Sequence, residues 1–180
     1  DLVILYYTFN DPDYPEYYFN KNFFNKNFMV ARYIQYRIKK AMIKRDRKLR
    51  RINSEEENFN YLYTLGYWEN SKNAILELSE IAEKKNFRFA VIVNPEMSFS
   101  VINFREGYPY WYINEKLAAL KGKGIPVIDT TYFLSEKNYS VLDLVVGERD
   151  RYKNAKANSI IASCASGELF RQGVINCSYN

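Results

Sequence analysis

The chain has 180 residues, a length that fits one domain with a sizeable buried core. It is 47% hydrophobic and its formal net charge is +5, so wholesale disorder is excluded and the charge alone is too small to indicate nucleic-acid binding. No histidine is present, which removes the commonest general base and the commonest metal ligand. The two cysteines, Cys164 and Cys177, lie in no metal-ligand or redox spacing, and we expect neither a cofactor nor a metal.

The first predicted element is a strand over Leu2 to Tyr7, a continuous apolar run typical of a strand buried on both faces. Because the chain opens directly on this run and has no initiator Met, we expect a fragment or a processed product. Residues 10–27 are rich in Asn, Asp, Pro and aromatic residues, which predicts a long loop. Helical spacing then predicts an inserted helix over about residues 28–51, followed by a polar and aromatic connection over 53–70.

The second half of the predicted 28–51 helix is densely basic, with Asp46 as its one acidic residue. By default these cations form the solvated face of an inserted helix. The alternative is that residues 37–51 bind an anionic surface, either a glycan or a lipid. Nucleic acid is not an expected partner, because no aromatic residues are interleaved with the charges to stack on bases. The cations are Arg37, Lys39, Lys40, Lys44, Arg45, Arg47, Lys48, Arg50 and Arg51.

Beyond residue 70, predicted helices and strands alternate. They are a helix over 71–85 capped by Asn70 or Ser71, a strand over 87–93, a helix over 110–121 that stops at Gly122 or Gly124, a strand over 125–129, a helix over 154–170 and a tail over 171–180. This alternation implies right-handed crossovers and a parallel sheet, hence a single α/β domain over residues 1–170. Three strands make a thin sheet, which favours missing N-terminal elements.

Polar residues follow each predicted strand directly: Asn10 and Asp11 after the first, Asn94 after the second, and Asp129 at the end of the third. In open α/β sheets the ligand site lies beyond the carboxyl ends of the strands, so these side chains are expected at one rim. The alternative is structural, since Asn and Asp commonly end strands and begin turns.

Two segments carry a family resemblance. Asp1 to Leu5 followed by Phe9-Asn10-Asp11 resembles the strand and Gly-x-Asn-Asp block of SGNH/GDSL hydrolases, with Thr8 in the Gly position. Residues 150–158 resemble the last block of that family, which reads Asp, one or two residues, His-Pro-Asn and then a helix. Here Tyr152 stands at the His position and Lys153 at the Pro position. With the intervening strand ends, the resemblance covers roughly residues 1–11 and 71–170.

The resemblance implies the three-layer, flavodoxin-like sandwich of SGNH hydrolases, here incomplete at the N-terminus and without the Gly-Asp-Ser nucleophile block. It also implies Asn10 as an oxyanion-hole donor and Asp150 as the residue that orients the catalytic base. A Tyr at the base position has an ordinary pKa near 10, so Tyr152 would be a poor base at pH 7. A structural role for Asp150 is slightly preferred, as the cap of the helix that begins near Asn154.

Two functions follow from this resemblance. One is a hydrolase of an ester, an acetyl or acyl group on a carbohydrate or lipid, of which this chain is a piece without the nucleophile. The other is a non-catalytic, degenerate SGNH-like module that binds a glycan or an anionic surface, and the missing Ser, His and Pro favour it for this chain taken alone. The aromatic cluster Tyr108, Tyr110, Trp111 and Tyr112 is interpreted as core and rim packing, with sugar stacking as the alternative. The sequence assigns no cell compartment.

Overall fold

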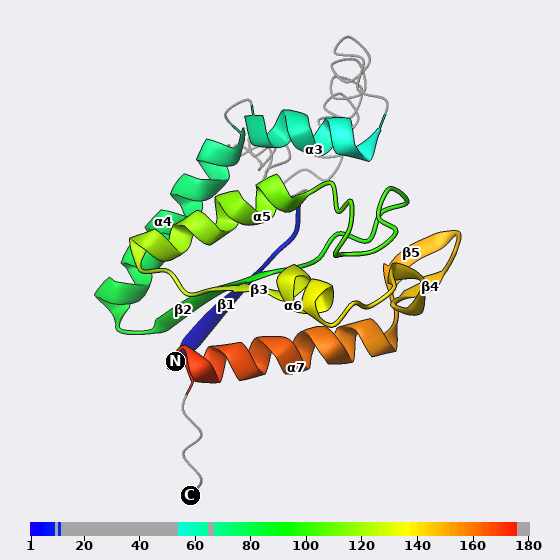
Figure 1. The fold of residues 1–180 in the computed structure, drawn as a ribbon. Coiled ribbons are helices and arrows are strands. Elements are labelled where there is room, and N and C mark those ends of the chain that lie inside the picture. Colours follow the sequence, from blue (N-terminus) through cyan, green and yellow to red (C-terminus); the bar gives the residue numbers. More distant parts are fainter. Residues whose placement is uncertain (10, 12–53, 65–66, 176–180) are drawn as a thin grey trace, which may run out of the picture. The chain divides into compact units, whose positions relative to one another are not determined.

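The computed structural model describes residues 1–9, 11, 54–64 and 67–175 (Figure 1). The chain divides into two compact units, one of Asp1–Asp11 with Lys72–Asn180 and one of Pro12–Ser71. The predicted basic helix over residues 28–51 and most of the predicted loop over 10–27 lie outside the described residues. No helix within the described ranges combines the length and apolarity needed to cross a bilayer.

The larger unit is built on a three-stranded parallel sheet in the order β1-β2-β3 (Figure 1). β1 is Leu2–Tyr7, β2 is Arg88–Val93 and β3 is Val127–Asp129. Every residue of β2 after Arg88 is apolar and buried, as expected for the central strand of a sheet that is covered on both faces. The predicted mixed α/β fold with a parallel sheet is confirmed.

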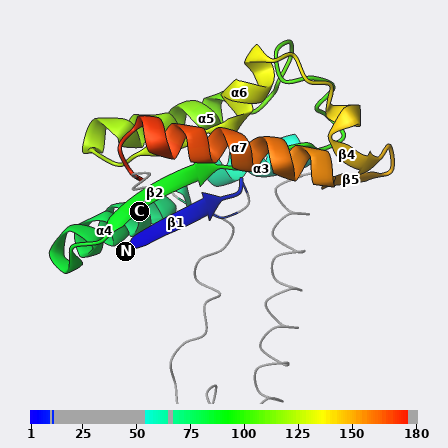
Figure 2. The ribbon, with the colours of Figure 1, turned by 90° about the horizontal axis from the view of Figure 1, so that it is seen from below.

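Helices cover the two faces of this sheet (Figures 1 and 2). The Lys72–Lys85 part of α4 (Tyr67–Lys85) and α5 (Trp111–Ala118) lie on one face, and α7 (Ala155–Arg171) lies on the other. A 3-10 helix, η2 (Ala119–Lys123), extends α5 and ends at Gly124. Gly124 has φ 80°, a left-handed conformation that costs glycine little, so the predicted helix stop is confirmed.

The core on the α7 face combines small and branched side chains. Its buried members are Ala90, Ile92, Ile128, Ala165, Leu169 and Val174. Apolar residues at helical spacing on α5 and α7 are buried in this core and beside it: Ile113, Leu117, Ala157, Ile161, Ala165 and Leu169. On α4, Ile75 and Ala82 are buried whereas Ile81 is exposed.

β1 differs from its prediction as a strand buried on both faces. Val3, Ile4 and Tyr6 are 40%, 43% and 46% exposed. Among the described residues β1 has a neighbouring strand on one side alone, because it lies at the edge of the sheet beside β2. An edge position, which composition does not reveal, accounts for the error.

Two helical segments replace the predicted connection over residues 53–70, so that prediction was wrong. α3 spans Glu55–Thr64, and α4 begins at Tyr67 instead of residue 71. A reciprocal capping box opens α3: the Glu57 N–H donates to Ser54 Oγ at 3.1 Å, and the Ser54 N–H donates to Glu57 Oε2 at 3.2 Å.

Four short elements lie between β3 and α7, where no regular structure was predicted. Helix α6 (Thr130–Glu136) follows β3 directly, and the 3-10 helix η3 (Val141–Asp143) comes next. β4 (Val145–Gly147) and β5 (Asp150–Lys153) then form a separate antiparallel pair. This pair places the segment with Asp150 and Tyr152 on a hairpin instead of on a loop.

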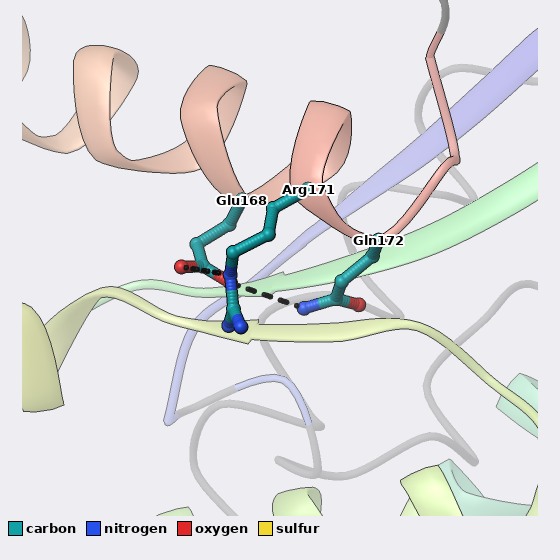
Figure 3. A network of polar contacts seen from close by, with 3 residues as sticks. All are labelled: Glu168, Arg171 and Gln172. Carbon is teal, nitrogen blue, oxygen red and sulfur yellow. Dashed lines mark hydrogen bonds and ion pairs between the residues drawn. The ribbon is translucent and has the colours of Figure 1, made fainter.

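The C-terminal end of α7 carries a small polar network (Figure 3). The Arg171 guanidinium donates to both carboxylate oxygens of Glu168, with Nη2 to Oε2 at 2.7 Å and Nε to Oε1 at 3.1 Å. Gln172 Nε2 donates to Oε2 at 3.3 Å. The hydrogen bond from Arg171 is the main reason why the pKa of Glu168 is lowered.

Candidate functional site

The carboxyl ends of the three strands lie at one edge of the sheet, and polar side chains link them. Tyr6 Oη donates to Asn94 Oδ1 at 2.6 Å, which ties the end of β1 to the end of β2. Thr130 Oγ1 donates to the Val93 carbonyl at 2.6 Å, which ties the end of β2 to the residue after β3. Val93 is also paired in register with Asp129. The parallel register therefore brings Asn94 and Asp129 to the same rim.

The candidate oxyanion residue Asn10 lies outside the described residues. Its neighbours form a tight turn after β1, in which the Thr8 N–H and Thr8 Oγ1 each donate to the Asp11 carboxylate at 2.7 Å. The Asp11 N–H donates back to the Thr8 carbonyl at 3.0 Å. Asp11 thus has the turn-forming role that was the structural alternative for this position.

Asp129 is held by four hydrogen bonds from its own unit. Asn114 Nδ2 donates to both carboxylate oxygens at 3.0 Å, and Oδ1 also accepts the N–H groups of Thr131 and Tyr132 at 2.9 and 3.2 Å. Asp129 is therefore the N-cap of α6. The sequence reasoning missed Asn114, because an Asn in the middle of a helical pattern gives no signal until the fold brings it to Asp129.

The tyrosines that precede α5 are buried in a hydroxyl network. Tyr108 Oη accepts the Glu96 N–H at 3.1 Å, and Tyr110 Oη lies 2.9 Å from Ser98 Oγ and 2.8 Å from Ser100 Oγ. Tyr108 and Tyr110 are almost fully buried and meet edge to face with their ring centroids 5.5 Å apart. Burial raises the pKa of Tyr108 well above its ordinary value, so it stays a neutral phenol. For these two residues core packing, not a sugar platform, is the correct interpretation.

Asp150 and Tyr152 occupy β5. Asp150 Oδ1 accepts the backbone N–H of Tyr152 at 3.1 Å, and the Tyr152 residue is 80% exposed. The cap of α7 is instead Asn154, whose Oδ1 accepts the Ala157 N–H at 2.9 Å. The predicted capping role of Asp150 was wrong, because the hairpin turns its carboxylate back onto its own strand.

Asn154 also joins three elements. Its Nδ2 donates to the carbonyls of Asp143 and Val145, both at 3.0 Å, and its backbone N–H donates to the Leu144 carbonyl at 3.0 Å. One side chain therefore fixes the end of η3 and the start of β4 against the first turn of α7.

The segment from Ser140 to the end of β5 meets the loop after β2 at two points. The Arg151 guanidinium carbon lies 5.1 Å from the centroid of the Phe99 ring, and Asn103 pairs with Ser140 in an antiparallel bridge. Figure 1 shows this region beyond the carboxyl ends of the strands. We call the exposed apolar residues of these two segments the apolar lobe: Phe99, Ile102, Leu142, Val146 and Tyr152.

Lys153 follows Tyr152 on β5 and is an ammonium with a shifted pKa. Burial lowers the pKa of the Lys153 ammonium, and the Glu96 carboxylate opposes this shift. Within the described ranges, no three His, Cys, Asp or Glu side chains form a group that could hold a metal ion.

Comparisons with protein-family models, with curated proteins and with solved structures give no match for this chain. Membership of the SGNH/GDSL hydrolases therefore stays a prediction from the motifs.

Proposed function

We propose that this chain is a non-catalytic binding module for an ester-bearing carbohydrate or lipid, on an SGNH-like α/β scaffold. The observation that carries the proposal is the environment of Asp150. Its carboxylate accepts a backbone N–H of its own hairpin, and the Tyr152 phenol at the base position is exposed. Ester hydrolysis by this family's route needs a group that takes the proton of the nucleophile and a carboxylate that orients that group. Phenols are poor proton acceptors, so a tyrosine at this position does not supply the first.

The apolar lobe supports the expected class of partner. Phe99 and Tyr152 each expose an aromatic side chain, of a kind that stacks on the apolar face of a sugar ring, and Arg151, which lies against Phe99, supplies hydrogen-bond donors for hydroxyl or carbonyl oxygens. Ile102 and Val146 add exposed aliphatic surface that suits an acyl chain.

The second candidate is the ester hydrolase itself, with this chain as one piece of it. It is favoured by the position of the Thr8–Asp11 turn directly after β1, where the resemblance places the oxyanion block. This candidate requires a Gly-Asp-Ser strand outside residues 1–180, and the coding sequence upstream of Asp1 tests for one.

Binding and turnover are measured on the same preparation. We expect an acetylated xylo-oligosaccharide to bind the wild-type chain in an NMR titration. We expect Tyr152→Ala to bind it with an affinity at least about tenfold lower. Tyr132→Ala is the matched control, because Tyr132 is also exposed but lies on α6 outside the lobe. We expect no turnover of 4-nitrophenyl acetate above the buffer rate.

Two results would contradict the binding module. Stoichiometric labelling of one serine by a fluorophosphonate probe would favour the hydrolase. If the wild-type chain and Tyr152→Ala bound the oligosaccharide with equal affinity, the apolar lobe would not be its binding surface.

A further inference from the structure

Two basic side chains of β5 face the loop after β2. The first and third residues of β5 are exposed, whereas Arg151 and Lys153 are partly buried. The guanidinium carbon of Arg151 lies 5.1 Å from the centroid of the Phe99 ring. The charge of the Glu96 carboxylate, on the same loop, acts on Lys153. The two cations lie about 7 Å apart along the strand and meet the same short segment, residues 96–99.

Neither cation is neutralised by an acidic neighbour. Among the described residues no carboxylate forms an ion pair with Arg151 or Lys153, and Nε of Arg151 is buried without a hydrogen-bond partner. Glu96 attracts Lys153 from beyond ion-pair distance, and one of its carboxylate oxygens accepts a backbone N–H of its own loop. Asp150, the acidic residue of β5, also binds a backbone N–H of its own strand. Because basic side chains are seldom buried without a partner, this pair is suited to an external anion.

The position of the two cations is also typical of a ligand site. The β4–β5 hairpin and the loop after β2 lie beyond the carboxyl ends of the sheet strands (Figure 1). Ligands of open α/β sheets bind in this region. Partial burial strengthens the attraction between a cation and an anion, because less water screens their charges.

We propose that Arg151 and Lys153 form a binding site for a phosphate monoester group. The planar N–H fork of a guanidinium matches two phosphate oxygens, and an ammonium supplies a compact positive charge. A phosphate monoester carries nearly two negative charges at pH 7, which matches the two cations, whereas a carboxylate or a phosphodiester carries one. The contact with Phe99 holds the guanidinium in place for this role.

This site goes beyond the proposed function and is tested apart from it. The probe contains neither a sugar nor a carboxylic ester, so its failure to bind would leave the oligosaccharide proposal standing. A failure of the oligosaccharide to bind would likewise leave the phosphate site standing. The same phosphate group occurs on sugar phosphates and on the lipid phosphatidic acid, and the experiment distinguishes these two sources.

The test uses the full chain and methyl phosphate. The probe is titrated at pH 7 and constant ionic strength, and the backbone amide signals of β5 are followed by NMR. We expect saturable binding that weakens at least about tenfold in Arg151→Gln and in Lys153→Gln, because each variant loses one charge-assisted contact. Arg149→Gln and Lys156→Gln are the matched controls. They remove the same charge from exposed positions just before and just after β5, and we expect no change.

Two further probes define the ligand. Dimethyl phosphate carries a single negative charge, and we expect it to bind at least about fivefold more weakly than methyl phosphate. Vesicles of phosphatidylcholine that contain phosphatidic acid identify the source of the group. Sedimentation of the wild-type chain, but not of Arg151→Gln, with these vesicles would assign the phosphate to a lipid. Binding of methyl phosphate without such sedimentation would assign it to a soluble phosphate ester.

Three outcomes would overturn the proposal. The first is no saturable binding of methyl phosphate to the wild-type chain, and the second is equal binding of methyl and dimethyl phosphate. The third is an equal loss of affinity in Arg149→Gln, which would mean that net charge and not this pair attracts the anion. Circular dichroism establishes that the variants are folded. Should Arg151→Gln unfold, Lys153→Gln and the comparison of the two phosphates decide the question.

Discussion

Two aspartates, Asp129 at the end of β3 and Asp150 at the start of β5, differ in how many hydrogen bonds hold them. Asp129 accepts four hydrogen bonds and caps α6, whereas Asp150 is exposed and accepts one. We expect Asp129→Ala to lower the free energy of unfolding by roughly 2–4 kcal/mol, because it removes a cap and leaves the buried Asn114 amide without its acceptor. Asp150→Ala should change it by less than about 0.5 kcal/mol. Urea unfolding of both variants measures the difference, and equal effects would contradict these roles.

Cys164 is a free, buried thiol on α7. Burial is the main reason why its pKa is raised to about 11. About one thiol in a thousand is then ionised at pH 8, against roughly one in four for an ordinary cysteine. In a Cys177→Ser background we expect iodoacetamide to modify Cys164 at least about a hundredfold more slowly at pH 8 than in 8 M urea. Mass spectrometry follows the reaction, and similar rates in the two solvents would contradict the burial.

The Glu168–Arg171 pair predicts a small dependence of stability on pH. The pKa of Glu168 is lowered in the folded chain, so its contribution is present above the unfolded pKa near 4.3 and is lost as the pH falls through the lowered value. We expect Glu168→Gln to lower Tm at pH 7 by at most about 2 °C, because the Arg171 side chain of the pair is largely exposed to solvent. The difference should shrink as the pH approaches 3. Glu80→Gln, which alters the exposed Glu80–Lys84 pair, is the control and should leave Tm unchanged.

At the level of residues, the sequence predicted which polar groups end the strands but not their partners. Asn94 and Asp129 follow buried apolar runs, so their rim position could be inferred. That Tyr6 binds Asn94 and that Asn114 binds Asp129 depends on contacts between elements far apart in the chain. No local pattern encodes such contacts.

Among the elements, the loop and hairpin before α7 depend on one side chain. Asn154 caps the helix and donates to two carbonyls of the preceding segment. We expect Asn154→Ala to lower the free energy of unfolding by about 1–3 kcal/mol. Asn158→Ala, one turn later on the same helix and exposed, is the control and should stay within about 0.5 kcal/mol of wild type. Chemical denaturation distinguishes them, and equal stability of the two variants would exclude the joining role.

The elements that were predicted correctly have apolar residues that recur at regular helical or strand spacing. The elements that were missed lack such a regular spacing. α5 and α7 follow helical spacing and end at residues suited to helix termini. α3 opens with the capping box of Ser54 and Glu57, a signal that was present but was outweighed by the polar composition around it. β4 and β5 have three and four residues, too few to show any period. The edge position of β1 depends on the sheet as a whole.

The whole molecule carries one tryptophan in each compact unit, which allows the units to be followed separately. Trp68 stacks on Tyr63 in the smaller unit, and Trp111 contacts Tyr108 in the larger one. We expect the fluorescence of Trp68, measured in Trp111→Phe, to change at a urea concentration at least about 0.5 M below that of Trp111, measured in Trp68→Phe. The reason is that the fluorescence of Trp111 changes only when the sheet separates from the helices on its two faces.

Coincident midpoints would contradict that order. They would mean that α4, which is continuous through both units, couples them into one cooperative transition.

The order of strands in the sheet also has a consequence for how the chain reaches its fold. The hydrogen bond that joins the ends of β2 and β3 spans 37 residues, whereas the one that joins β1 and β2 spans 88. Closing the longer loop costs about 0.8 kcal/mol more in chain entropy, and long-range pairings of this kind form slowly. The β2–β3 pair is thus expected to form first, and β1 to dock last. Until it does, the apolar edge of β2 is open, and this interval is when the folding chain is most exposed to aggregation.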